Sequence, residues 1–291
     1  MNKVVAKIWH SKYVQFFVPD KLYLSLYFRK RFGYNMNWKE PKTFNEKIQW
    51  LKLYDRKDTY TRIVDKLSVR EYISKVVGEE FLVKLLGVYN SVDEINYDEL
   101  PKQFVLKTTH DSGGVVICKD KNKFNKDKAE KKLNYSMKHN YYWLWREWPY
   151  KNVEHKIICE EYLKEDDKKD EGIKDYKVLC FNSEPKIIQV CEGRHKKGGV
   201  RFGFYDTKWN ELEVKRVKHN SLENRAQRPE ILDEMLEIAR KLSEGFKFIR
   251  VDFYIVNNKL YCGELTFYPA SGFEGFEPEE YDRIMGEWID L

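Results

Sequence analysis

The sequence lacks the patterns that mark several protein classes. Its five cysteines are scattered and form no C-x-x-C pair, which argues against a disulfide framework or a zinc site and indicates buried, reduced thiols. No apolar run approaches the roughly 20 residues of a membrane-spanning helix, and lysines interrupt the apolar residues of segment 1–20, unlike those of a signal peptide. We therefore expect a cytoplasmic protein without an integral membrane segment. The N-terminal aromatics and lysines are compatible with peripheral membrane contact, but helix packing is the simpler explanation.

No long block of basic residues is present either. The 53 lysines and arginines and the 47 acidic residues give a net charge of +6, and both signs are spread along the chain. This pattern predicts a mildly basic surface and no nucleic-acid partner. At 291 residues the chain can form one large domain or two moderate lobes, and binding clefts commonly lie between such lobes.

Residues 1–64 are predicted to be helical. In "PKTFNEKIQWLKLYD", Pro41 and the capping-box pair Thr43 and Glu46 precede apolar residues at helical spacing. The same periodicity predicts three further helices. They are expected at residues 65–77, 126–147 and 229–243.

The other apolar segments are strand-like. Most are joined by short turns rather than by regular helices, so antiparallel pairing should dominate and the fold class should be α+β. The strand segments are residues 103–109, 114–120, 155–163, 175–182, 185–192, 248–256 and 259–267.

A lysine stands inside one of these strands, ahead of paired glycines. In "FVLKTTHDSGGVV", Lys107 precedes Ser112, Gly113 and Gly114, and a second apolar run follows. A Walker A loop has its lysine after the glycines and opens a helix, so a β-hairpin fits this segment better. The backbone N–H groups of its tip could hold a phosphate chain, with the lysine neutralising the charge beneath. A plain glycine hairpin with a solvent-facing lysine remains the alternative.

The two strands nearest the C-terminus form a second predicted hairpin. A three-residue loop, 257–259, pairs Ile255 with Tyr261 and places Asp252 opposite Glu264. A two-residue loop would shift this pairing by one residue. The longer loop keeps apolar partners together, which antiparallel pairing favours.

Two adjacent carboxylates on mostly apolar strands need compensation, because they repel each other and are costly to desolvate. Mg²⁺ is a simple solution, since it commonly binds one or two carboxylates together with phosphate oxygens. Arg250 projects to the same face as Asp252 and is an equally good explanation as an ion-pair partner.

Taken in order, these segments resemble the TupA-like ATP-grasp proteins, named after a teichuronopeptide biosynthesis protein. The resemblance rests on "KTFNEKIQWLKLYDR", "DKLSVREYI", "FVLKTTHDSGG", "ICEEYL", "DYKVLCFN", "FYDTKWN", "FIRVDFY" and "GELTFYPASGF". It implies an ATP-grasp fold in which two α+β lobes grip ATP behind a helical N-terminal region. The implied parts are residues 1–64, a first lobe at 65–157 with the glycine hairpin, and a second lobe at 158–291 with the metal-binding strands.

The resemblance also implies a nucleotide site. Lys66 and Lys107 would bind phosphates beneath the tip formed by Ser112, Gly113 and Gly114. The hinge would frame adenine with Glu160, Glu161, Tyr162 and Leu163, and Asp175 would bind ribose. The mid-domain phosphate site has no clear lysine, which leaves Arg194 or Arg201 to fill it.

The implied reaction centre combines Arg250 and Lys107 with two Mg²⁺ ions. Asp252 and Glu264 would bind the metal. Thr266 stands where the family commonly has asparagine, so its role as the third ligand is the weakest part of the match.

The family resemblance implies carboxylate–amine ligation through an acylphosphate. Surface-polysaccharide pathways suggest a uronic-acid saccharide as the carboxylate and an amino acid or small amine as the nucleophile. One alternative is a glycosyltransferase, although "RVDFY" contains no D-x-D. The other is a non-catalytic polysaccharide-assembly protein with a degenerate nucleotide site.

Overall fold

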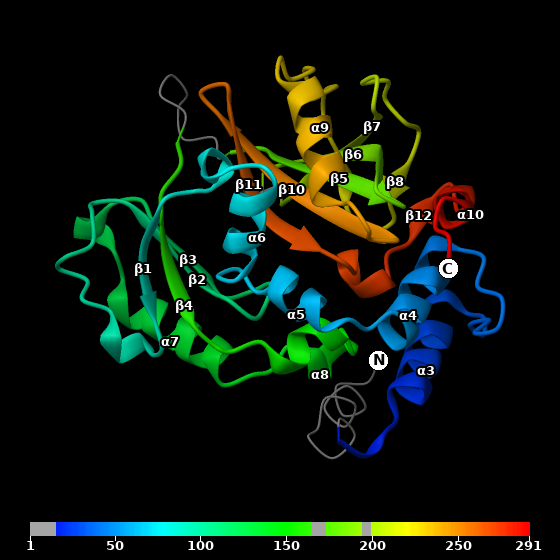
Figure 1. Ribbon diagram of the computed structural model, residues 1–291, viewed down its shortest axis with the longest axis horizontal. Helices are drawn as coiled ribbons and strands as arrows, with labels where there is room; N and C mark the ends of the chain where they lie inside the picture. The colour runs from blue at the N-terminus through cyan, green and yellow to red at the C-terminus, as the bar shows by residue number, and fades with distance from the viewer. Residues whose placement is uncertain (1–15, 165–172, 194–198) are drawn as a thin grey trace.

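The computed structural model describes residues 16–164, 173–193 and 199–291. It contains a four-stranded and a six-stranded sheet, with helices packed on both (Figure 1). Apart from β7 and β9, every ladder between named strands is antiparallel, so the predicted α+β class is confirmed.

The described N-terminal helices include the one that the capping box predicts. The side chain of Thr43 accepts a hydrogen bond from the Glu46 backbone N–H at 3.2 Å, and the Glu46 carboxylate accepts one from Thr43 N at 3.1 Å. This reciprocal pair satisfies two donors that the first helical turn leaves unpaired. The helices of this region are α3 (Asp20–Phe32), α4 (Phe44–Tyr54), α5 (Asp58–Val64) and α6 (Val69–Val76).

The four-stranded sheet has the order β1-β4-β2-β3 and lies at the left of Figure 1. Helix α7 packs against β2 and β3. Along β2, Leu106 is buried while Lys107 is half-buried, so the lysine points to the face opposite the sheet's apolar core. The elements are β1 (Leu85–Tyr89), β2 (Phe104–Thr108), β3 (Val115–Cys118), α7 (Lys126–Met137) and β4 (Ile157–Glu161).

The predicted helix over 126–147 is shorter than expected. Helix α7 ends at Met137, and a separate short helix, α8, covers Tyr142–Trp145. Between them the side chain of Asn140 accepts a hydrogen bond from Tyr142 N at 3.0 Å, which starts the new helix instead of continuing the old one. The prediction missed this break because the aromatic run has no glycine or proline before Trp148.

The six-stranded sheet has the order β11-β10-β5-β6-β7-β9. Helix α9 covers the face of β5, β6 and β10 that carries Val178 and Cys180. Helices α5 and α6 contact β11 and lie between the two sheets in Figure 1. The elements are β5 (Asp175–Phe181), β6 (Glu184–Glu192), β7 (Arg201–Asp206), β9 (Asn220–Ser221), α9 (Leu232–Leu242), β10 (Phe248–Val256) and β11 (Lys259–Thr266).

Shorter elements complete the chain. Strand β8 pairs with β12, and α10 packs against α4 near the C-terminus. They are η1 (Glu79–Phe81), η2 (Val92–Glu94), η3 (Lys121–Lys123), η4 (Trp148–Asn152), β8 (Lys215–Arg216), η5 (Pro269–Gly272), β12 (Phe276–Glu277) and α10 (Glu280–Glu287).

The β10–β11 hairpin corrects one part of the predicted register. Its loop is the two-residue turn Asn257-Asn258, with φ of 50° and 58°, which is the left-handed geometry of tight hairpin turns. Ile255 consequently pairs with Leu260, so the predicted pairing with Tyr261 was wrong.

The predicted pairing of the two carboxylates is nevertheless confirmed. Asp252 lies opposite Glu264, whereas the next pair toward the turn is Phe253 and Cys262. Gly263 is therefore an extra residue on β11, and this bulge shifts the register by one position. A β-carbon on Gly263 would lie 2.7 Å from the Tyr254 ring, so the bulge also depends on a residue without a side chain.

Two further predictions concern burial and the membrane. All five cysteines are buried and free, as predicted. None of the described helices is long and apolar enough to cross a membrane. The predicted division between residues 157 and 158 falls inside β4, and the three-part division of the chain stays a prediction.

Candidate functional site

The predicted carboxylate pair lies in a compact charged cluster on the six-stranded sheet. Arg250 binds Asp252 with two hydrogen bonds, from Nε to Oδ1 at 2.5 Å and from Nη2 to Oδ2 at 2.7 Å. The same Nη2 lies 3.1 Å from Oε1 of Glu264 and 3.2 Å from Oγ1 of Thr266. From the neighbouring strand β5, Lys177 donates to Oδ2 of Asp252. One arginine and one lysine thus hold both carboxylates and Thr266 on one face of three adjacent strands.

Burial and charge shift the two carboxyl groups in opposite directions. Burial raises the pKa of Asp252, and Arg250 and Lys177 only partly offset this effect. Burial would also raise the pKa of Glu264, but Arg250, Lys177 and Lys66 together lower it to about 2. Glu264 is therefore a fully ionised carboxylate at neutral pH, and 38% of its side chain remains exposed. Of the pair, it is the oxygen donor that a ligand can reach.

The predicted phosphate lysine is held by a hinge carboxylate. Lys107 Nζ donates to Oε2 of Glu160 at 2.5 Å, and Arg70 Nη1 donates to Oε1 at 3.0 Å. Strands β2 and β4 pair Val105 with Glu160, so Lys107 and Glu160 share one face of the sheet. The structure therefore brings together two residues that the sequence analysis assigned to opposite ends of a nucleotide.

The glycine hairpin of the prediction is present, and Asp111 organises its tip. The Asp111 carboxylate accepts hydrogen bonds from Thr108 Oγ1 at 2.6 Å and from Gly114 N at 3.0 Å, and it is also bonded by Ser136. Burial would raise the pKa of Asp111, but these donors and Lys66 lower it. The tip is thus closed around an ionised side chain that the sequence analysis had not singled out.

Within the tip, the two glycines have different surroundings. A β-carbon on Gly114 would lie 1.7 Å from Thr108 Oγ1 and 2.6 Å from Ser136 Oγ, whereas one on Gly113 would meet nothing within 4 Å. Ser112 is exposed and donates to the Tyr141 hydroxyl at 3.2 Å. Close packing therefore requires glycine at 114 but not at 113.

Lys66 connects the two sheets. Its Nζ donates to the backbone oxygen of Asp111 in the tip. Burial lowers the pKa of Lys66, while the carboxylates of Glu264 and Asp111 oppose this shift and the neighbouring charge of Lys107 adds to it. Lys66 thus forms a hydrogen bond with the glycine hairpin and interacts electrostatically with Glu264 of the carboxylate pair. The predicted phosphate and metal residues therefore belong to one charged cluster between the two sheets.

The other predicted nucleotide residues lie along the hinge and the first strand after it. Glu161 is exposed at the end of β4, and its backbone N–H donates to Lys84 O at 3.0 Å. Tyr162 and Leu163 follow and are half-buried. Asp175 is buried, with an oxygen 3.8 Å from Lys177 Nζ. The predicted Arg194 lies outside the described residues.

Lys177 is the main site residue that sequence reasoning missed. It stands in "DYKVLCFN", two residues after Asp175 on a strand that is otherwise buried, and a cation in such a position needs a carboxylate partner. That signal was present in the sequence. The identity of the partner was not, because Asp252 is 75 residues away.

The donor set fits a hard divalent cation only in part. Among the described residues, no three His, Cys, Asp or Glu side chains are grouped closely enough to hold a metal ion. Glu264 offers ionised, partly exposed oxygens of the kind that Mg²⁺ prefers, while both oxygens of Asp252 bind Arg250 or Lys177. A metal at this pair would therefore need phosphate or water oxygens in addition, which is the usual coordination of Mg²⁺ beside a nucleotide.

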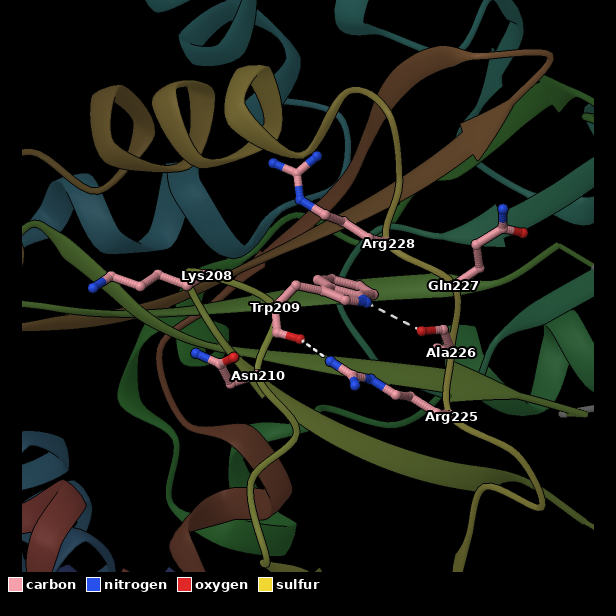
Figure 2. A pocket seen from close by; sticks show the side chains of 7 residues that line it. All are labelled: Lys208, Trp209, Asn210, Arg225, Ala226, Gln227 and Arg228. Carbon is pink, nitrogen blue, oxygen red and sulfur yellow. Dashed lines mark hydrogen bonds between the residues drawn. The ribbon is translucent and has the colours of Figure 1, made fainter.

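An open pocket elsewhere is not part of this cluster. Figure 2 shows its lining, in which Trp209 donates to Ala226 O at 3.1 Å and Arg225 donates to Trp209 O at 2.7 Å. The Trp209 ring lies against Tyr176, which alternates with Lys177 along β5. Because successive strand residues point to opposite faces, this pocket lies across the sheet from the carboxylate pair.

Comparison with known proteins gives one family match. The family model described as TupA-like ATPgrasp matches residues 46–290. A search of curated proteins finds no match. Among solved structures, the chain resembles D-alanine-D-alanine ligase from Helicobacter pylori with 17% identity and a TM-score of 0.42, covering 84% of this chain and 69% of that one. A RimK domain ATP-grasp protein from Sphaerobacter thermophilus has 11% identity and a TM-score of 0.43, covering 81% of this chain and 70% of that one.

Proposed function

Because the chain belongs to the TupA-like ATP-grasp family, we propose that it is an ATP-dependent carboxylate–amine ligase. In the proposed reaction, ATP phosphorylates a carboxylate, and an amine then displaces the phosphate to form an amide. The carboxylate is a uronic-acid saccharide of a surface polysaccharide, and the amine is an amino acid or another small amine. This assignment of substrates extends the family resemblance and is tested below.

One observation carries the proposal. Lys66 and Lys107 from the glycine-hairpin side and Arg250 from the carboxylate side belong to one charged cluster, in which Glu264 is acted on by both Lys66 and Arg250. Phosphoryl transfer demands little covalent chemistry from a protein, because catalysis consists largely of positioning and of stabilising charge on the transferring oxygens. Three cations in one cluster supply that stabilisation, so no catalytic triad is needed.

Each group of residues would bind a different part of the nucleotide. Lys107 and Lys66 bind the phosphate chain beneath the tip of Ser112, Gly113 and Gly114. The hinge residues Glu160 to Leu163 hold the base, and Asp175 holds the ribose. Arg250 binds the transferring phosphoryl group and, after transfer, the acylphosphate.

Asp252 and Glu264, with Thr266 beside them, would hold Mg²⁺. The bound metal supplies charge neutralisation and orientation for the β- and γ-phosphates. The protein's own contribution at this place is to keep Glu264 ionised, through Arg250, Lys177 and Lys66, over the whole physiological pH range.

The test is product analysis by mass spectrometry. The protein is incubated with ATP, Mg²⁺, a panel of uronic acids and uronic-acid saccharides, and a panel of amines. We expect ADP, phosphate and an amide whose mass is the sum of acid and amine less one water. Arg250→Met should abolish the product, whereas Arg240→Met, which changes an exposed arginine on α9, should not. Consumption of a nucleotide sugar without ATP would instead establish a glycosyltransferase, and absence of both activities would favour a non-catalytic role.

A further inference from the structure

A buried lysine and a buried glutamate share one hydrogen-bonded network, and neither has been assigned to the nucleotide. Glu147, after α8, is 3% exposed, and Lys52, on α4, is fully buried. Lys52 Nζ donates to Ser271 O at 2.7 Å, to Gln49 Oε1 at 3.0 Å and to Trp145 O at 3.0 Å. Ser271 Oγ in turn donates to Oε1 of Glu147 at 2.5 Å. The lysine has three oxygen acceptors, and the carboxylate is held by a serine.

The serine stands in a strained turn that begins shortly after the metal-binding strand. Ala270, Ser271 and Gly272 have φ of 47°, 56° and 63°, so two residues with side chains adopt the left-handed conformation in succession. Such strain persists only where surrounding structure enforces it, and it clusters at functional sites. Here Gln49 Nε2 donates to the backbone oxygens of Ser271 and Gly272, at 3.0 and 2.7 Å. The turn is thus built to place the Ser271 hydroxyl against Glu147.

The Glu147 carboxylate lies within the electrostatic reach of the reaction centre. Burial raises its pKa, Lys52, Ser271 and Arg250 lower it, and Glu264 raises it further. The hydrogen bond from Ser271, which lies five residues after the end of β11, fixes Glu147 near the end of the strand that carries Glu264. A carboxylate with a raised pKa is suited to exchange protons near neutral pH.

Two tyrosines complete the surroundings of Glu147. Burial and then the charge of Glu147 raise the pKa of both Tyr141 and Tyr150. Tyr141 also accepts the hydrogen bond from Ser112 at the glycine tip. The residues around Glu147 therefore extend to the tip that would cover the phosphates.

One oxygen of Glu147 is left for a ligand. Within the described parts of the chain, the side chain of Glu147 has a single hydrogen-bond donor, Ser271, and that donor uses Oε1. Oε2 accepts no hydrogen bond from a described residue, and it is not among the polar atoms that are both fully buried and without a partner. An ammonium or amine group is the natural partner of such a carboxylate oxygen.

We propose that Glu147 binds the amine nucleophile and accepts its proton, with Ser271 and Lys52 holding the carboxylate in place. The inference rests on the proposed ligase reaction and names the nucleophile's site in it. The nucleophile enters as a primary ammonium ion and loses one proton to Glu147. The neutral nitrogen then forms the C–N bond to the acyl carbon, the C–O bond to phosphate breaks with its electron pair, and the second N–H proton leaves with the phosphate.

Hydroxylamine separates this role from a structural one. It is already neutral near pH 7 and traps an acylphosphate as a hydroxamate, so it needs no proton acceptor. With ATP, Mg²⁺ and the same acid panel, Glu147→Gln should form hydroxamate at a rate close to the parent's. Its rate of amide formation with a primary alkylamine should fall on the order of 10²-fold or more. The exposed carboxylate Glu154 offers a matched control, and Glu154→Gln should leave both rates unchanged.

A second variant guards against misfolding. Glu147→Gln alone leaves the buried Lys52 charge uncompensated, whereas Lys52→Met with Glu147→Gln removes both charges together, a change that buried pairs often tolerate. The double variant should likewise keep its rate of hydroxamate formation and lose most of its rate of amide formation. Equal losses of hydroxamate and amide in this folded double variant, or an unchanged rate of amide formation, would overturn the inference. If the parent forms neither product with any acid, the ligase proposal itself fails, and the inference falls with it.

Discussion

Asp252 and Glu264 are neighbours, as predicted, but their surroundings indicate that they contribute unequally to the free energy of unfolding. Asp252 is 3% exposed and receives two hydrogen bonds from Arg250 and one from Lys177, whose own side chain is 9% exposed. Asp252→Asn keeps the shape and removes the charge that compensates both cations. Breaking a buried pair in this way costs about 3–5 kcal/mol in the free energy of unfolding.

Glu264 makes a single contact with Arg250 at 3.1 Å, and 38% of its side chain is exposed. Solvent screening reduces the value of such a pair to about 0–1 kcal/mol. Glu264→Gln should therefore leave the free energy of unfolding almost unchanged. Both substitutions should nevertheless lower ATP-dependent turnover on the order of 10²-fold or more, because each removes charge from the proposed phosphate and metal centre.

Urea unfolding of the two variants measures the difference directly. We expect the free energy of unfolding of Asp252→Asn to fall below that of Glu264→Gln by about 2–5 kcal/mol. Adding Lys177→Met to Asp252→Asn should recover part of the loss, because it removes one uncompensated cation. Equal unfolding free energies for the two single variants, or further loss in the double variant, would refute the argument that Asp252 compensates two buried cations.

The glycine tip and the charged cluster lead to three further predictions. Gly114→Ala should cost about 1–3 kcal/mol in urea unfolding, because its β-carbon meets Thr108, whereas Gly113→Ala should be almost neutral; equal effects would contradict the packing of the tip. Lys107→Ala should weaken ATP binding by about 1.5–3 kcal/mol in calorimetry, and unchanged affinity would limit its role to the ion pair with Glu160. The pKa of Glu264, lowered to about 2, contributes stability above its ordinary value of 4.5 that is lost as pH falls toward 2; because 38% of the side chain is exposed, solvent screening limits this contribution to about 1 kcal/mol, and Glu264→Gln should remove this shallow acid limb of the unfolding free energy.

Features that depend on neighbours in sequence could be predicted well. The capping box of Thr43 and Glu46 is a contact over three residues, and the hairpin of Lys107 is set by a short tip. The pairing of Asp252 with Glu264 also followed from matching apolar partners along one hairpin. In each case the competing arrangements were few, and side-chain chemistry could choose among them.

One local feature was missed all the same. The two-residue turn with a bulge at Gly263 gives the same carboxylate pairing as the longer loop that the sequence analysis favoured, so pairing rules alone could not separate them.

Features that depend on distant partners could not be predicted in this way. The Lys177 contact with Asp252 joins two strands far apart in the chain, and the pairing of Glu160 with Lys107 depends on the sheet order. Such contacts are settled by topology, which local patterns do not encode.

The balance of charges in this cluster also gives a reason to expect a divalent cation in the proposed substrate complex. Lys107 is bound to Glu160, and Arg250 and Lys177 are both bound to Asp252. Two of the cations proposed to face the phosphates, Lys107 and Arg250, thus already have a carboxylate partner, which offsets much of their positive charge. A triphosphate bound at this cluster adds several negative charges that the side chains alone do not balance. Ions that arrive with the nucleotide would supply the difference, because Mg²⁺ binds phosphate oxygens and needs only one or two carboxylates from the protein. On this reasoning the carboxylates would have a second use: Asp252 and Glu264 would offer oxygens to the metal once Arg250 and Lys177 bind the phosphates instead.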